Sequence, residues 1–179
     1  MKKIIIILLL LNSSFIFSQT ISNNAPSPYL TDPFGEIVNG AEKENILTVI
    51  DRFMEAVNSQ EKSIFDKILY KGINRIVTNV EKDGSVSTLI FDNDSSIARR
   101  IGNTGERKFR ERYWDAKVIT EGNIASVWAP YDFYIDGSFS HCGVDLFYLV
   151  KSNGTWKIAH FGYCLLYTSD AADEEASGG

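Results

Sequence analysis

The stretch from Asn123 to Tyr163, NIASVWAPYDFYIDGSFSHCGVDLFYLVKSNGTWKIAHFGY, decides the fold. It holds runs rich in β-branched and aromatic residues, separated by Asp136-Gly137 and Asn153-Gly154. Both dipeptides favour the type I′ turn, which joins neighbouring antiparallel strands through a two-residue loop. The stretch therefore predicts consecutive antiparallel strands at residues 123–135, 138–151 and 155–163.

The same turns predict the register of the strands, because the residues that flank a two-residue loop pair directly. Counting outward from them puts Asp132 opposite His141 and Phe147 opposite His160. Side chains alternate between the two faces of a sheet. One face is predicted to be polar and aromatic, with Trp128, Asp132, Tyr134, His141, Asp145, Phe147, Trp156 and His160. The other is predicted to be more apolar, with Ala129, Tyr131, Phe133, Cys142, Val144, Leu146, Tyr148, Ala159 and Phe161.

The polar face gathers both histidines of the chain beside two carboxylates. A carboxylate next to an imidazole holds its tautomer and raises its basicity, which suits general acid–base catalysis. The candidate catalytic residues are His141 as proton shuttle, Asp132 as its orienting partner, and Asp145. An ordinary polar pair on the sheet is the alternative interpretation. The residues expected to line a ligand pocket are Trp128, Tyr134, Phe147, His160, Phe53 and Trp114.

Upstream of this stretch the pattern is helical first and strand-like afterwards. Residues 42–58 place Ile46, Ile50, Phe53 and Val57 at helical spacing, and residues 62–70 predict a second, shorter helix. Helices followed by antiparallel strands indicate an α+β fold. The remaining predicted elements are strands at 73–80, 86–91 and 108–120, a turn at Lys82-Asp83-Gly84, and a short third helix at 94–101.

The ends of the chain differ from this domain, which spans residues 42–163. Residues 1–18 combine Lys2 and Lys3 with an apolar run and a small residue at the cleavage position, as in a signal peptide. Residues 19–41 carry turn formers and no periodicity, so we expect an extended leader segment. Residues 164–179 resemble a translated sequencing adapter, and we expect them to be a non-native tail excluded from the fold.

Composition argues against several classes of function. The formal net charge is -5, but four of the acidic residues lie in the tail, and a nearly neutral body without a basic cluster argues against nucleic-acid binding. Outside the tail Cys142 is the only cysteine, and it is predicted to face away from His141, so no Cys/His nucleophile pair is expected. These few ligands cannot complete a zinc site, and no phosphate-binding glycine loop is present. We expect no metal and no cofactor.

The order of elements and several stretches resemble the nuclear transport factor 2-like superfamily, above all its exported Bacteroidetes members of the SnoaL-like or lumazine-binding branch. The similar stretches are 112–118, 123–134, 139–143 and 156–158. The resemblance implies a cone-shaped fold in which a curved antiparallel sheet wraps around the N-terminal helices and encloses a pocket. It also implies a homodimer, often formed through the outer sheet face, and enzymatic relatives that use Asp, His and Tyr in the pocket.

Three functions remain open from the sequence. The first is an exported domain that binds a small apolar or aromatic molecule in a pocket. The second is an isomerase, cyclase or dehydratase that uses the Asp–His pair, with Asp145, His160 or Tyr134 assisting. The third is a non-catalytic module that dimerises through the apolar face. The signal peptide predicts a periplasmic or secreted protein without stable membrane insertion after cleavage.

Overall fold

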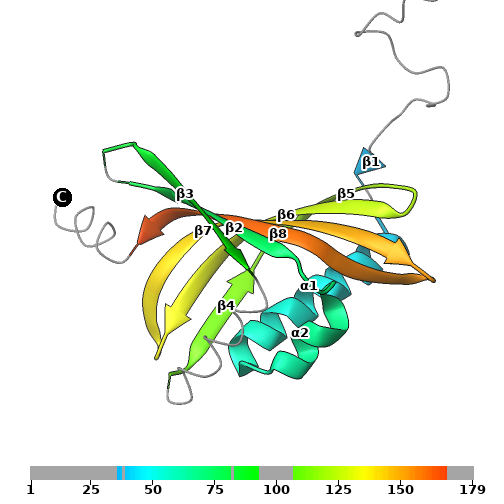
Figure 1. Ribbon diagram of the computed structural model, residues 1–179, viewed down its shortest axis with the longest axis horizontal. Helices are drawn as coiled ribbons and strands as arrows, with labels where there is room; N and C mark the ends of the chain where they lie inside the picture. The colour runs from blue at the N-terminus through cyan, green and yellow to red at the C-terminus, as the bar shows by residue number, and fades with distance from the viewer. Residues whose placement is uncertain (1–35, 38, 82, 93–106, 169–179) are drawn as a thin grey trace, which may run out of the picture. The chain divides into compact units, whose positions relative to one another are not determined.

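The computed structural model describes residues 36–37, 39–81, 83–92 and 107–168, all of them in one structural unit, Pro33–Gly179. In this unit two helices lie on one face of a curved sheet (Figure 1), which confirms the predicted α+β class. The predicted signal peptide and the predicted helix at 94–101 lie outside the described residues. The elements are β1 (Glu36–Ile37), α1 (Ala41–Ser59), α2 (Lys62–Ile68), β2 (Asn74–Val80), β3 (Val86–Asp92), β4 (Phe109–Tyr113), β5 (Lys117–Glu121), β6 (Ile124–Ile135), β7 (Ser138–Ser152) and β8 (Thr155–Thr168).

The sheet has the strand order β1-β5-β6-β7-β8-β2-β3, and β4 pairs with the second half of β6. Its strands are antiparallel except for β2 and β8, which run parallel from Arg75↔Phe161 to Asn79↔Leu165. The sheet is therefore mixed, whereas the sequence predicted an antiparallel one. The chain already runs parallel to β8 directly after α2, because Leu69 forms a parallel bridge with Ile158 of β8, and β2 continues in this direction.

The predicted strand at 108–120 is two strands in the structure. β4 and β5 are separated at Trp114–Ala116, where Asp115 has a left-handed φ of 45°. Both pair with β6, β4 near its end and β5 near its beginning. The break lets the chain cross from one half of the long β6 to the other.

Both predicted type I′ turns are confirmed, but the register that follows them is not. Asp136 and Gly137 have φ of 53° and 86°, and Ile135 pairs with Ser138 as predicted. Two residues further on, an extra residue in β7 forms a β-bulge, so Phe133 pairs with His141. A second bulge, between β7 and β8, shifts the pairing from Leu149↔Ile158 to Tyr148↔His160. Each extra residue sends the following side chains to the opposite face.

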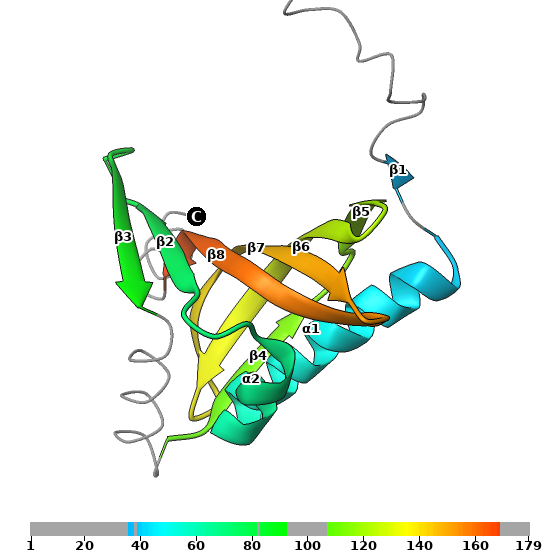
Figure 2. The same cartoon turned by 45° about the vertical axis from the view of Figure 1, so that its right-hand side comes forward.

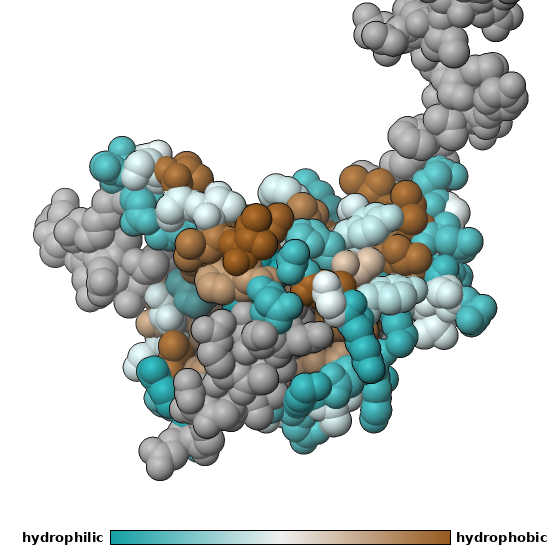
Figure 3. All heavy atoms as spheres, viewed as in Figure 1, coloured by the Kyte–Doolittle hydropathy of each residue, from teal (hydrophilic) through white to brown (hydrophobic). Residues whose placement is uncertain are grey.

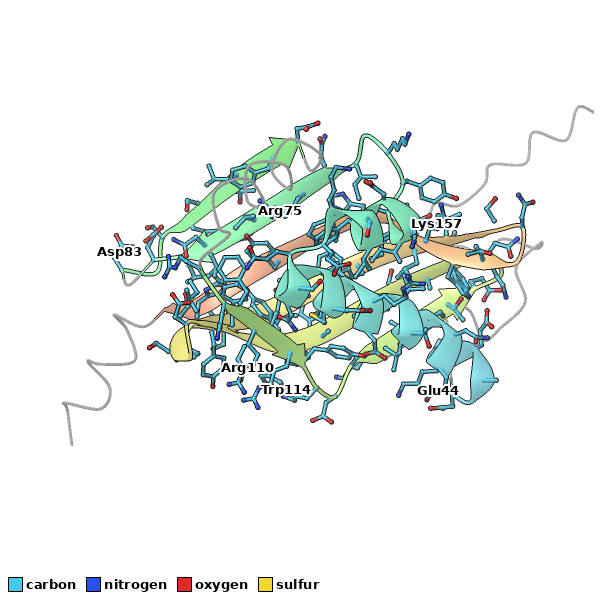
Figure 4. All side chains as sticks on the ribbon, turned by 90° about the horizontal axis from the view of Figure 1, so that it is seen from below. Glu44, Arg75, Asp83, Arg110, Trp114 and Lys157 are labelled. Atoms are coloured by element: carbon cyan, nitrogen blue, oxygen red, sulfur yellow. The ribbon has the colours of Figure 1, made fainter. Side chains whose placement is uncertain are left out.

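The hydrophobic core lies between the helices and the sheet (Figure 4, seen from the helix side). Predicted helix 42–58 corresponds to α1, whose buried side chains follow helical spacing. Phe53 stands at the centre, with edge-to-face contacts to Phe65, Phe147 and Phe161 at centroid distances of 5.5, 5.0 and 4.9 Å. Such aromatic contacts add to the stabilisation from burial alone. We call the sheet face that meets the helices the inner face and the opposite one the outer face.

The last strand continues beyond Tyr163 to Thr168. The sequence predicted residues 164–168 to lie outside the fold, but four of these five residues pair with β7, and Cys164 and Leu165 also pair with β2. The exception is Leu166, where a further bulge shifts the register between β7 and β8. The predicted leader contributes the short strand β1, which pairs with β5 through Glu36↔Thr120. Among the described residues, no helix combines the length and apolar character needed to cross a membrane.

Candidate functional site

The two bulges divide the predicted site between the faces of the sheet. His141 pairs with the buried Phe133 and stacks on its ring at 4.9 Å, on the inner face, where Asp145 and Phe147 also lie. The predicted partners of these residues are on the outer face, because the register is shifted by one residue. They are Trp128, Asp132, Tyr134 and His160.

The predicted Asp132–His141 pair is wrong. Asp132 lies opposite Cys142, and its carboxylate accepts hydrogen bonds from Arg112 on β4, at 2.8 Å from Nε and 2.6 Å from Nη2. These hydrogen bonds and the charge of Asp132 raise the pKa of the Arg112 guanidinium. Nδ1 of His141 lies 3.0 Å from the hydroxyl of the neighbouring Ser140 instead. Asp132 is thus part of an ion pair across β4 and β6.

A pair of buried carboxyl groups occupies the inner face. Asp145 on β7 is 3% exposed and is hydrogen-bonded to Glu111 on β4, which is 9% exposed. Burial, the nearby charge of Glu111 and the hydrogen bond to it together raise the pKa of Asp145 well above its usual value. Two buried carboxyls in contact cannot both ionise cheaply, so the contact favours the protonated form of Asp145.

Tyr131 lies diagonally from Asp145 on the same face, since Ala129 pairs with Asp145 and Tyr131 with Gly143. Its hydroxyl is buried and has no hydrogen-bond partner among the described residues, and the same is true of Oδ2 of Asp145. Burial, followed by the charges of Asp145 and Glu111, raises the pKa of Tyr131. The phenol is therefore a neutral hydrogen-bond donor at physiological pH.

Aromatic rings surround this polar group. The ring of Tyr131 makes edge-to-face contacts with His141 at 5.8 Å and with Tyr163 at 6.2 Å. A Cβ atom at position 143 would lie 3.1 Å from the Tyr131 ring and 1.9 Å from the carbonyl oxygen of Cys164, so only glycine fits between them. We call Asp145, Glu111, Tyr131, His141 and Tyr163 the inner cluster.

The outer face carries a separate hollow of about 470 Å³. Trp128 and His160, both predicted to line a pocket, do line this one, but it lies outside the core. Its other lining residues come from β2, β7 and β8: Ile76, Thr78, Val144, Leu146, Gly162, Tyr163, Cys164 and Leu166. We call it the outer hollow.

The other predicted pocket residues are placed elsewhere. Phe53 and Phe147 are buried in the core and line neither hollow. Trp114 is exposed and, together with Arg112 and Asp132, lines a shallow hollow of about 420 Å³. Figure 4 labels Trp114 next to Arg110. The guanidinium of Arg110 lies over the ring of Tyr134, with its Cζ atom 4.1 Å from the ring centroid. Within the described part of the chain no group of side chains could hold a metal ion.

The apolar face proposed for dimerisation is also divided. Tyr131 and Phe133 are buried on the inner face, whereas Val144, Leu146 and Tyr148 lie on the outer one. Sequence reasoning missed Glu111 and Tyr131 as site residues. Glu111 lies in the charged run RER and carries no visible signal, but Asp145 stands alone in the apolar run GVDLFYLV, which is the pattern of a buried charge.

No protein-family model and no curated protein matches the sequence. Solved structures do resemble the fold. A protein of unknown function with a cystatin-like fold from Nostoc punctiforme is 11% identical, with a TM-score of 0.56 over 73% of this chain and 96% of that one. A nuclear transport factor 2-like protein of unknown function from Pseudomonas putida is 12% identical, with a TM-score of 0.56 over 75% and 93%.

A type 2 hexachlorocyclohexane dehydrochlorinase is also similar in structure, with 9% identity and a TM-score of 0.55 over 72% of this chain and 88% of that one. At these identities the likeness is one of fold. The chain has the nuclear transport factor 2-like fold, also called cystatin-like, as the sequence resemblance implied. This fold supports binding and enzymatic functions alike, so the function must be argued from the site.

Proposed function

We propose that the chain is an exported domain that binds a small, largely apolar molecule through the inner cluster. One observation carries the proposal: within the part of the chain that the structure describes, the buried Oδ2 of Asp145 and the buried hydroxyl of Tyr131 both lack a hydrogen-bond partner. A buried polar group left unpaired costs about 1–3 kcal/mol, so two of them on one face mark a place prepared for a polar partner.

The chemistry of the two atoms specifies the polar end of the ligand. The phenol of Tyr131 donates a hydrogen bond, and Oδ2 of Asp145 accepts one when the other oxygen of that carboxyl makes the contact with Glu111. A ligand hydroxyl satisfies both, since it accepts from Tyr131 and donates to Asp145. A ligand carboxylate would meet the charge of the acid pair in a low-dielectric environment and would be rejected.

The test compares 2-naphthol with 2-naphthoate by isothermal titration calorimetry at pH 7. We expect 2-naphthol to bind and 2-naphthoate not to bind. Tyr131→Phe removes the donor with little change in shape and should weaken 2-naphthol binding about tenfold, as expected for a buried hydrogen bond. Tyr148→Phe, on the exposed outer face, is the matched control and should bind like the wild type. Equal affinity in the wild type and Tyr131→Phe would contradict the proposal.

A second candidate function is proton-transfer catalysis at the same cluster. Its support is that Asp145, whose pKa is raised by burial and by Glu111, lies on the same face as His141, a combination that general acid–base catalysis uses. The dehydrochlorinase of the same fold is an enzyme, which keeps this candidate open. We expect deuterium exchange next to the carbonyl of β-tetralone, followed by NMR, to run above the buffer rate and to fall to it in His141→Gln.

A further inference from the structure

The outer hollow is a concave apolar surface on the face of the sheet away from the helices. Trp128 is 52% exposed and Leu146 is 44% exposed, and both line it. Large side chains this exposed in one contiguous hollow mark an interaction site more often than isolated ones do. The volume of about 470 Å³ lies in the range of small-molecule sites, which is roughly 300–1,000 Å³.

One wall of the outer hollow carries polar atoms. His160 and Thr78 line it, and among the described residues neither side chain has a hydrogen bond or an ion pair. The imidazole can accept or donate a hydrogen bond, and the indole of Trp128 offers a flat surface for stacking. The hollow thus combines an aromatic platform, aliphatic walls and a hydrogen-bonding wall formed by His160 and Thr78.

The β2–β3 hairpin bounds the hollow on one side. Figures 1 and 2 show the hairpin rising away from the plane of β6, β7 and β8, on the side opposite the helices. Figure 3 shows hydrophobic side chains gathered beside it along the upper part of the same view. The raised hairpin contributes Ile76 and Thr78 to one side of the hollow, and the resulting concave shape suits a small occupant better than a flat sheet face.

We propose that the outer hollow binds a neutral, flat aromatic molecule of two or three rings that carries one hydrogen-bonding group. The rings stack on Trp128 and pack against Leu146, and the polar group bonds to His160. This site and the inner cluster lie on opposite faces of β6, β7 and β8, and Tyr163 on β8 is the one residue that the two have in common. Eight of its ten lining residues precede Cys164, so it does not depend mainly on the predicted tail.

The experiment uses the full chain and N-phenyl-1-naphthylamine, a neutral aromatic amine whose fluorescence rises in apolar sites. We expect saturable binding of one probe per monomer, with the monomer verified by light scattering at the same concentration. Trp128→Ala should weaken binding at least tenfold, and Leu146→Ala about threefold or more. Both side chains are exposed, so the variants should fold, and circular dichroism verifies it.

Two matched variants separate the proposal from its alternatives. Ile119→Ala removes an exposed apolar side chain of the same face outside the hollow, and Tyr131→Phe alters the inner cluster. Both variants should bind the probe with an affinity within twofold of that of the wild type.

The proposal would be overturned if probe binding does not saturate, or if Trp128→Ala binds the probe as tightly as the wild type does. Loss of binding in Tyr131→Phe would place the probe at the inner cluster. A dimer that both Trp128→Ala and Ile119→Ala dissociate would assign the face to a second copy instead.

Discussion

Phe147→Ala is expected to destabilise the fold by about 3–5 kcal/mol, the usual cost of removing a buried aromatic side chain. Phe147 is fully buried, packs edge-to-face on Phe53 at 5.0 Å and stacks on Phe161 at 6.1 Å. The truncation leaves a cavity between α1 and the sheet that rigid neighbours cannot fill. Urea unfolding followed by circular dichroism measures the difference in the free energy of unfolding.

The neighbouring residue supplies the control. Leu146 points to the outer face and is 44% exposed, so Leu146→Ala should change the free energy of unfolding by less than about 1 kcal/mol. The pair of variants also tests the shifted register. If Phe147 lined an open pocket, as the sequence predicted, its truncation would cost little, and a value below about 1.5 kcal/mol would contradict its place in the core.

Asp145→Asn is expected to abolish a fall in stability with rising pH. The unfolded chain releases the Asp145 proton near pH 3.9, whereas the folded chain keeps it to a higher pH because its pKa is raised by burial and by Glu111. Between these values the folded state binds more protons. The free energy of unfolding therefore falls as pH rises, by up to about 1.4 kcal/mol per pH unit.

This contribution is fully present below the unfolded pKa and is lost as pH rises through the folded one. Hydrogen bonds lower the pKa of Asp136, Asp83 and Glu42, so these groups act in the opposite sense, but only in acid. The comparison therefore belongs between pH 5 and 8. Asp145→Asn cannot lose the proton, so its profile should be flatter and the variant more stable than the wild type at pH 8.

Glu55→Gln controls for the change in net charge, because Glu55 is exposed on α1. Its pH profile should be parallel to that of the wild type. Urea denaturation at each pH gives all three profiles. If the Asp145→Asn profile is also parallel to that of the wild type, the folded state does not raise the pKa of Asp145, and the prediction is wrong.

The sequence predicted local structure better than it predicted which side chains meet. The turns at Asp136-Gly137 and Asn153-Gly154 are determined by backbone geometry that few residues tolerate, so both could be recognised. The bulges near Ser140 and Ala159 have no comparable residue requirement, so the sequence carries no local signal for them. Without them Asp132 and His141 would have been neighbours.

The predicted chemistry failed for the same physical reason. Side chains alternate with a period of two, so a shift of one residue moves a side chain to the other face. The sequence therefore grouped Trp128, Asp132 and His160 with residues of β7 that lie on the opposite face in the structure: His141, Asp145 and Phe147. Asp145 could be recognised as a buried charge, but its partner Glu111 comes from β4, which meets the site only through tertiary pairing with β6. Long-range partners of this kind leave little trace in a single sequence.

The parallel pairing of β2 with β8 constrains the order in which the molecule can assemble. Ile76 pairs with Gly162, so residues made early in synthesis receive their partner only from the last strand. The β2–β3 hairpin can form locally, but its place in the sheet exists only once β8 has left the ribosome. Pairings this distant in sequence are slow to form, and we expect the exposed hairpin to be the part of the nascent chain most in need of protection from aggregation.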